Sequence, residues 1–233
     1  MQESISVVLP AYNEAENIKE VVEEIFGFLD KNFFDFEVIV VDDGSKDTTP
    51  QIVTALQKEK GNRLRLIRHS TNRGYGAALR SGLFSAQKEL VFYTDADGQF
   101  DIEKLKDFVD AIKEYDLIVG YRIQRQDIWL RKLYSFVYNK LIQLLFGLRV
   151  RDIDCSFKLF HRDCLGKLSI ERDNFFVDTE LLLKAKNNNC RFREIGIKHR
   201  PRRKGKSTVK FKHIFVTLGD ILYFYPRRKY GRS

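Results

Sequence analysis

Short apolar runs alternate, along the first half of the chain, with segments in which apolar residues recur at helical spacing. The runs cover residues 5–9, 36–41, 64–67 and 90–94, and each has the length of a buried strand. After the first run the apolar positions follow one helix face: Ile18, Val21, Val22, Ile25, Phe26 and Leu29. Strands that alternate with helices predict an α/β fold, with a mostly parallel central sheet covered by helices on both faces.

The residues before each helical segment predict where the helix begins. Asn13 precedes acidic residues, so we expect the first helix to begin there. Asp47 or Thr48 is expected to cap the second helix, and residues 72–76 to open the third.

Polar residues follow each of four predicted strands, in segments 10–14, 42–45, 72–76 and 95–99. The carboxyl ends of parallel strands lie at one edge of a sheet, where α/β proteins bind their ligands. We therefore expect these four segments to converge on one functional edge.

The segment after the fourth run carries two carboxylates one residue apart, Asp95 and Asp97, followed by Gly98. Alternate residues of a strand point the same way, so both can turn toward one divalent cation. Oxygen ligands favour Mg²⁺ or Mn²⁺, and such a cation commonly also holds substrate phosphates. The alternative is an ordinary turn at a strand end, since Asp and Gly are common turn residues.

Other site motifs are missing from the first half. It contains no Ser/His/Asp cluster and no GxxxxGK[ST] phosphate loop. Gly74 and Gly76 begin a dinucleotide-binding pattern, but Leu79 stands where its third glycine belongs, so we reject that interpretation. The four histidines are scattered and are interpreted as structural.

The second half contains a strand at 116–122, which leads to Arg122 and Arg125, and two further amphipathic helices. The first, over 130–148, has an apolar stripe typical of a core-facing helix, although Trp129 and flanking lysines keep a role at a membrane surface open. Its stripe comprises Leu130, Leu133, Tyr134, Val137, Leu141, Leu144, Leu145 and Leu148. The second has Phe211, Ile214, Phe215, Leu218, Ile221, Leu222 and Tyr225 on one face and is followed by a basic tail. This pattern predicts an amphipathic, interfacial C-terminal segment.

Charge is distributed unevenly along the 233 residues. Residues 1–120 carry 14 Lys and Arg against 22 Asp and Glu, whereas residues 121–233 carry 27 against 10. The acidic half suits a cation, and the basic half suits an anionic partner such as a phosphate or an anionic bilayer. Hydrophobic content of 43% with 31% charged residues excludes a disordered chain.

Three cysteines without metal-type spacing, Cys155, Cys164 and Cys190, suit reduced thiols in a cytosol. We see no signal peptide and no apolar stretch of about 18 residues, the length that a membrane span needs. The expectation is a cytoplasmic protein that is soluble or peripheral on the cytosolic face of a membrane.

The segments 10–14, 42–45 and 95–99, in this order and spacing, resemble the nucleotide-sugar half of family 2 glycosyltransferases of the GT-A fold. The resemblance implies that a GDP- or UDP-sugar binds here. It assigns the nucleotide-sugar to Pro10, Tyr12, Glu14, Asp43, Asp95 and Ala96, with Asp43 on the base. It assigns the metal on the diphosphate to Asp95, Asp97 and Gln99.

The second half resembles the dolichyl- and polyprenyl-phosphate sugar synthases of the same family. Their motifs fall on Gly120 and Arg122, on Arg151, Asp152, Ser156 and Phe157, and on Arg202, Gly205 and Ser207. Cys155 stands where the family has serine and Ser156 where it has glycine. The resemblance implies that Arg122, Arg151, Ser156, Arg202 and Ser207 bind an acceptor phosphate. It divides the chain into a donor half (1–125), an acceptor half (126–208) and a membrane-peripheral segment (209–233).

The expected reaction is an inverting, metal-dependent transfer of mannose or glucose to a polyprenyl phosphate. Asp97, Arg122, Arg151 and Arg202 are the expected catalytic residues. A phosphate acceptor is already ionised near neutral pH and needs no general base. Transfer to a glycan hydroxyl would need one, with Glu180 or Asp178 as candidates. A third interpretation is a non-catalytic basic module that binds nucleic acid or an acidic membrane. The leading interpretation, a glycosyltransferase, includes no nucleic acid among its partners.

Overall fold

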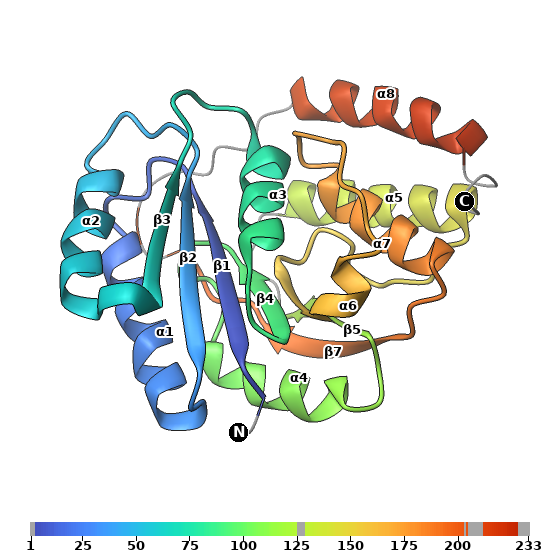
Figure 1. Ribbon diagram of the computed structural model, residues 1–233. Helices are drawn as coiled ribbons and strands as arrows, with labels where there is room; N and C mark the ends of the chain where they lie inside the picture. Colours follow the sequence, from blue (N-terminus) through green and yellow to red (C-terminus); the bar gives the residue numbers. More distant parts are fainter. Residues whose placement is uncertain (1–2, 125–128, 203, 205–211, 228–233) are drawn as a thin grey trace.

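Figure 1 shows a computed structural model of the chain, which describes residues 3–124, 129–202, 204 and 212–227. A seven-stranded sheet runs through it in the order β3-β2-β1-β4-β6-β5-β7. Its strands are β1 (Ile5–Ala11), β2 (Phe36–Asp42), β3 (Leu64–Arg68), β4 (Leu90–Thr94), β5 (Leu117–Ile123), β6 (Phe157–His161) and β7 (Phe192–Lys198). All neighbours pair in parallel except β6, which is antiparallel to both β4 and β5. The predicted mostly parallel sheet is confirmed.

Helices cover both faces of the sheet, as predicted (Figure 1). They are α1 (Ile18–Asn32), α2 (Thr49–Lys60), α3 (Tyr75–Ser85), α4 (Leu105–Ile112), α5 (Trp129–Phe146), α6 (Arg162–Leu165), α7 (Val177–Asn187) and α8 (Lys212–Arg227), with 3₁₀ turns at Gly61–Arg63 and Ile102–Lys104. Successive residues of β1 serve opposite faces: Val7 and Leu9 pack in the core under α1, α2 and α4, and Val8 in the core under α3, α5 and α7. Strands buried on both faces explain the uninterrupted apolar runs of the sequence.

The apolar stripe of α1 is buried along its whole predicted length. The predicted beginning of this helix is wrong, because α1 begins at Ile18 and Asn13 adopts a left-handed φ of 56°. The backbone of the intervening loop bonds to the β2–α2 loop instead: Glu14 N–H donates to Thr49 Oγ1 at 2.9 Å, and Ala15 N–H to Asp47 Oδ2 at 3.1 Å. Thr48, one of the two expected residues, is the N-cap of α2 but makes no side-chain cap bond, whereas Asp47 before it accepts from Thr49 N–H at 3.0 Å.

The core-facing interpretation of the helix over 130–148 is wrong for much of its stripe. Ile142, which the stripe omits, is fully buried, whereas Leu133, Val137 and Leu144 are exposed, Leu144 by 83%. The helix faces the core through Asn139, Ile142 and Phe146 instead, with Leu141 and Leu145 of the stripe partly buried beside them. Asn139 Oδ1 accepts from Ile153 N–H at 3.0 Å. An apolar face of α5 is therefore left on the surface.

The predicted apolar stripe of the last helix is partly buried and partly exposed. The structure describes the side chains of α8 from residue 219 to 226. Ile221 and Phe224 are buried against the α7 side of the core, while Leu222 and Tyr225 are exposed. Phe224 packs at 5.2 Å from the ring of Phe176, just before α7. The helix therefore docks on the protein through part of its apolar surface and presents the remainder outward.

Candidate active site

The polar segments after β1, β2 and β4 meet at one edge of the sheet, where the loops bind one another. Asn13 N–H donates to Ser45 Oγ at 2.9 Å, and Lys46 N–H returns a bond of 2.8 Å to Asn13 Oδ1. Gly44 has a φ of 70°, and a Cβ there would lie 2.4 Å from the backbone carbon of Thr71. Only glycine allows this close approach, so the β2 and β3 loops are held together by backbone shape.

Asp43, expected to bind the base, is buried in a network that fixes the loop before α3. Its Oδ1 accepts from Arg73 N–H at 2.9 Å, and its Oδ2 from Gly74 N–H at 2.8 Å. His69 Nδ1 lies 2.7 Å from Oδ1, and its other ring nitrogen lies 2.9 Å from Ser81 Oγ. The Asp43 carboxylate thus positions the loop, and contact with a base remains a prediction.

The two carboxylates after β4 have different neighbours. Asp95 accepts a bond of 2.5 Å from Ser156 Oγ, which comes from the other half of the chain. Asp97 accepts from Gln99 N–H at 3.1 Å. Burial, followed by the negative charge of Asp97, raises the pKa of the Asp95 carboxyl to about 7. Ionisation of Asp95 beside an ionised Asp97 is therefore unfavourable unless a positive charge lies next to the two carboxylates.

Arg202 places a guanidinium beside the same carboxylates. It lies 2.5 Å from Glu14 Oε1 and 3.3 Å from Asp97 Oδ2. Burial raises the pKa of Glu14, against the lowering effects of Asn17 and Arg202. The chain two residues before Arg202 is held at the same edge, since Gln99 Nε2 donates to the carbonyl of Arg200 at 3.1 Å. Residues 200–202 thus reach across the edge to the loops after β1 and β4.

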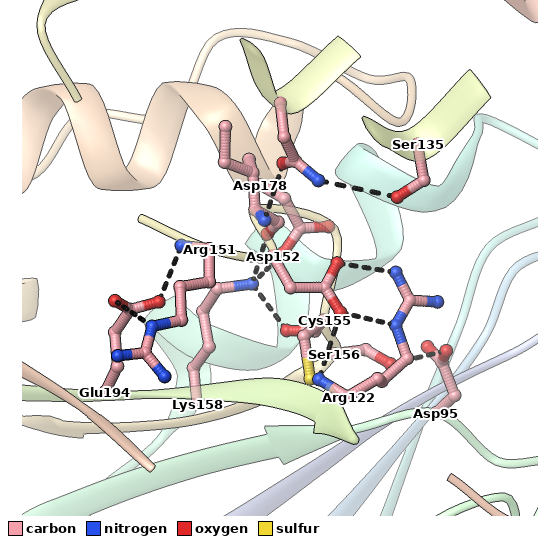
Figure 2. Close-up of polar contacts among 12 residues, drawn as sticks. Asp95, Arg122, Ser135, Arg151, Asp152, Cys155, Ser156, Lys158, Asp178 and Glu194 are labelled. Carbon is pink, nitrogen blue, oxygen red and sulfur yellow. Dashed lines mark hydrogen bonds and ion pairs between the residues drawn. The ribbon is translucent and has the colours of Figure 1, made fainter. Parts of the chain in front are cut away.

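Arg122 is held by a two-pronged ion pair at the end of β5 (Figure 2). Its Nε and Nη2 each donate to an oxygen of Asp152 at 2.7 Å, and its backbone N–H adds a third bond at 3.1 Å. The two side chains are only 9% and 7% exposed. Burial alone would lower the pKa of Arg122, but the bonds and charge of Asp152 outweigh it and raise that pKa above its ordinary value.

The remaining predicted residues occupy different settings. Pro10 and Ala96 are buried, and Tyr12 is half-buried directly after β1. The backbone N–H of Arg151 donates to Glu194 Oε1 on β7 at 2.7 Å, and its side-chain Nε lies 4.0 Å from Glu194 Oε2. Its guanidinium lies 4.7 Å from the ring of Tyr121 on β5. Ser207 lies outside the described residues. The structure thus brings Asp95 to Ser156 and Asp97 to Arg202, and it directs Arg151 toward Glu194.

Both candidate general bases are committed to internal contacts. Asp178 Oδ1 lies 2.5 Å from Lys158 Nζ and accepts from the hydroxyl of Tyr93 at 2.5 Å. Glu180 is fully buried and accepts from two backbone N–H groups, at residues 171 and 172, and from Lys184. Glu180 therefore fixes the chain before α7, and Asp178 belongs to a buried ion pair.

Sequence reasoning missed Lys158, Tyr93 and His69 as parts of the site's framework. Lys158 has no exposed surface, although it is the one charged residue in the otherwise apolar core of β6. A lysine in a buried strand implies a buried partner, and that was the available signal. His69 directly follows β3, at the same edge of the sheet as the other loops, and its position was the clue there.

The donor set is suited to a hard divalent cation. Across the part of the chain that the structure describes, no three His, Cys, Asp or Glu side chains gather as a metal-binding group. Asp95 and Asp97 provide two carboxylates, and the raised pKa of Asp95 reflects a pair that a cation would stabilise. Mg²⁺ is commonly bound through one or two carboxylates together with substrate phosphates, so these residues fit such an ion. None of the helices within the described ranges combines the length and the apolar character needed to cross a membrane.

Curated relatives share much of this chain. It is 32% identical, over 83% of its length, to a dolichyl-phosphate beta-glucosyltransferase of Homo sapiens, and 30% identical over 83% to that of Dictyostelium discoideum. It is 28% identical over 94% to an undecaprenyl-phosphate 4-deoxy-4-formamido-L-arabinose transferase of Aeromonas hydrophila. The chain spans 66%, 65% and 66% of these relatives' own lengths, respectively.

Solved structures share the fold. Glucosyl-3-phosphoglycerate synthase from Mycobacterium tuberculosis, in complex with Mn²⁺, UDP and glucosyl-3-phosphoglycerate, superposes with a TM-score of 0.71 at 19% identity. The match covers 97% of this chain and 80% of that one. The same enzyme with Mg²⁺ and UDP gives a TM-score of 0.72. Residues 6–169 match the family described as Glycosyl transferase family 2, and this match over more than half of the chain shows that the chain belongs to that family.

Proposed function

We propose that this protein transfers a hexose, mannose or glucose, from a GDP- or UDP-sugar to a polyprenyl phosphate, with inversion at the anomeric carbon. Mg²⁺ or Mn²⁺ is the proposed cofactor, held by Asp95, Asp97 and Gln99. Relatives named for dolichyl- and undecaprenyl-phosphate acceptors support the acceptor class. The fold match to an enzyme solved with Mn²⁺ and UDP supports a metal-bound nucleotide donor.

The observation that supports a phosphate acceptor is that both candidate general bases are bound by other groups of the protein. A hydroxyl acceptor needs a carboxylate that is free to take its proton. Asp178 is paired with Lys158, and Glu180 is fixed by two N–H groups and Lys184. A phosphate monoester has a second pKa of about 6, so it is largely ionised near neutral pH and attacks without a base. The site therefore suits a phosphate acceptor better than a sugar hydroxyl.

The chain's own groups then divide the work. Pro10, Tyr12, Glu14, Asp43 and Ala96 form the donor side, where Asp43 also fixes the adjoining loop. Arg122 uses two of the five N–H donors of its guanidinium to bind Asp152. Its other donors are proposed to bind the acceptor phosphate. Arg151, Ser156, Arg202 and Ser207 are proposed to complete the phosphate site. The divalent cation, when bound, offsets the charge that builds on the departing nucleoside diphosphate.

Membrane contact is proposed through α8 and the exposed face of α5. Leu222 on α8 is 74% exposed, and Trp129 on α5 is 73% exposed. The two helices adjoin, because the rings of Phe146 and Tyr225 lie 6.2 Å apart. Exposed apolar side chains beside lysines are typical of a helix lying on an anionic bilayer. The proposed place of action is thus the cytosolic surface of a membrane, with peripheral attachment.

The donor is tested by thermal unfolding with UDP, GDP and their sugar conjugates, with and without Mn²⁺. Binding to the folded state alone stabilises it by RT ln(1 + [L]/Kd), about 2.7 kcal/mol at a hundredfold excess over Kd. We expect a metal-dependent shift with one nucleotide, abolished in Asp97→Asn and retained in the control Asp110→Asn, whose side chain is 79% exposed. The absence of any shift would contradict an active nucleotide-sugar site and favour a non-catalytic module.

The acceptor is tested by transfer of labelled sugar to polyprenyl phosphate, to the matching polyprenol and to an oligosaccharide. The proposal expects product with the phosphate alone. Transfer to the oligosaccharide and not to the lipid phosphate would instead establish a glycan-hydroxyl transferase. Vesicle sedimentation tests the membrane contact: Leu144→Glu and Leu222→Glu should weaken binding to anionic vesicles. The control Phe34→Glu, at a residue 99% exposed between α1 and β2, should not.

A further inference from the structure

Lys158 lies at the centre of a buried polar network that joins the two halves of the site (Figure 2). Its Nζ donates to Asp178 Oδ1 at 2.5 Å, to the carbonyl of Cys155 at 2.6 Å and to the carbonyl of Ile153 at 3.0 Å. An ammonium group has three protons, and these contacts use all of them. Lys158 therefore has none left for a substrate, and its role must be exerted through its partners.

The cost of burying a charge indicates that this network is specific rather than incidental. Lys158 has no exposed surface, and Asp178 is 4% exposed. A buried ion pair is stable only when its remaining donors and acceptors are also satisfied. Here Tyr93 supplies a further bond of 2.5 Å to Asp178 Oδ1, and its ring faces the ammonium at 5.3 Å. The network is thus closed by groups from β4, β6 and α7.

The two carbonyls that Lys158 binds belong to one tight turn. Cys155 N–H donates to the carbonyl of Asp152 at 3.4 Å, which closes the turn over 152–155. A second anchor comes from α5, where Asn139 Oδ1 accepts from Ile153 N–H at 3.0 Å. The turn is therefore held from its inner side by Lys158 and from α5 by Asn139.

Functional side chains leave this turn at both of its ends. At the beginning, Asp152 binds the guanidinium of Arg122 through two bonds of 2.7 Å. Just beyond the end, Ser156 donates to Asp95 at 2.5 Å. One short segment thus fixes both a proposed acceptor residue and a proposed metal ligand.

We propose that Lys158 is a positioning residue which, by clamping the turn over 152–155, sets Arg122 for the acceptor and Asp95 for the metal–donor complex at the same time. This inference rests on the function proposed above for what the two residues bind. The clamp itself is independent of that function, because it concerns the placement of Asp152 and Ser156. Its loss should consequently affect acceptor and metal together, while the nucleotide contacts of β1 and β2 remain.

The test compares Lys158→Met with Lys184→Met. Lys184 is the matched control because it also pairs with a buried carboxylate, Glu180 at 2.7 Å, and it binds the chain near Ser169 instead of the turn. Three quantities are measured at a temperature where both variants are folded: the Kd for Mn²⁺ with saturating nucleotide, the KM for polyprenyl phosphate, and the Kd for nucleotide without metal. Loss of a group that orients a metal ligand typically weakens metal binding or activity about 10- to 100-fold.

We expect Lys158→Met to raise both the Kd for Mn²⁺ and the KM for the acceptor about tenfold or more, with the metal-free nucleotide Kd unchanged. The control should keep all three near wild type. Equal values in the two variants would overturn the proposal, and so would a uniform loss of all three in Lys158→Met. If that variant does not fold, Lys158→Gln/Asp178→Asn removes both buried charges and is measured in the same way. A wild-type protein that transfers no sugar would refute the function, and the Mn²⁺ measurement would still decide the clamp.

Discussion

The pair between Arg122 and Asp152 offers a quantitative test of how the proposed acceptor side is held in place. We consider Asp152→Asn, which keeps the shape of the side chain and removes its charge. Breaking a buried ion pair by altering one partner costs about 3–5 kcal/mol, because the other charge stays buried without compensation. The amide retains one oxygen that can still accept from the guanidinium, so we expect the low end, about 3 kcal/mol.

The matched control is Asp30→Asn, since Asp30 accepts from Arg63 at 2.6 Å but both side chains are 50% exposed. Exposed pairs contribute about 0–1 kcal/mol, so this variant should unfold close to wild type. At about 2–4 °C per kcal/mol for a chain of this size, Asp152→Asn should lower Tm by roughly 6–12 °C.

Urea unfolding of Arg122→Met, Asp152→Asn and the double variant measures the coupling directly. We expect the double variant to be more stable than the sum of the single losses predicts, because no unpaired charge remains. Additive losses within about 0.5 kcal/mol would refute the reasoning, since independent sites behave in that way. A loss in Asp30→Asn equal to that in Asp152→Asn would refute it as well.

Three further outcomes are expected. Gly44→Ala should lower the free energy of unfolding in urea by more than about 2 kcal/mol, because the new Cβ would lie 2.4 Å from a backbone carbon at a left-handed φ. The control Gly27→Ala, with nothing within 4 Å of the new Cβ, should not destabilise the protein. Arg202→Ala should enlarge the Tm increase that Mn²⁺ produces, because the cation then neutralises Asp97 without a competing guanidinium 3.3 Å away; an unchanged increase would count against this. Burial, then the charge of Asp152, raises the pKa of the Cys155 thiol to about 12, and the side chain has no exposed surface. Labelling of Cys155 at pH 8 should therefore be slow in the native protein and fast in urea, and equal rates in the two would contradict this.

The first half of the fold was predictable because its strands are buried on both faces. Continuous apolar runs such as residues 36–41 leave little ambiguity, and their polar ends mark the functional edge. The strand β7 was not predicted, since Phe192–Lys198 lies at the edge of the sheet and six of its seven residues are partly or fully exposed. A sequence that is half polar and carries a glycine lacks the alternation that would identify a strand.

Side-chain direction limited the prediction of the second half. Apolar residues occupy more than one face of α5, and spacing alone cannot tell which face meets the sheet; Asn139, a polar residue bound to the backbone of Ile153, lies on the buried side. The commitment of Asp178 was also hidden, because Lys158 and Tyr93 are 20 and 85 residues away in sequence. Such contacts depend on tertiary pairing, which no local pattern records.

The reversed direction of β6 determines how residues from the second half of the chain meet those from the first half. In the antiparallel pair Thr94 faces Phe157, so the residue before β6 emerges beside the residue after β4. Ser156 and Asp95 are brought together by that alignment, and a parallel β6 would carry Ser156 to the opposite edge. A slip of one residue would move Ser156 by about 3.3 Å and turn the strand's side chains over. The spacing between Ser156 and Asp95 is thus set by a strand register, which a change in the length of the surrounding loops would not alter.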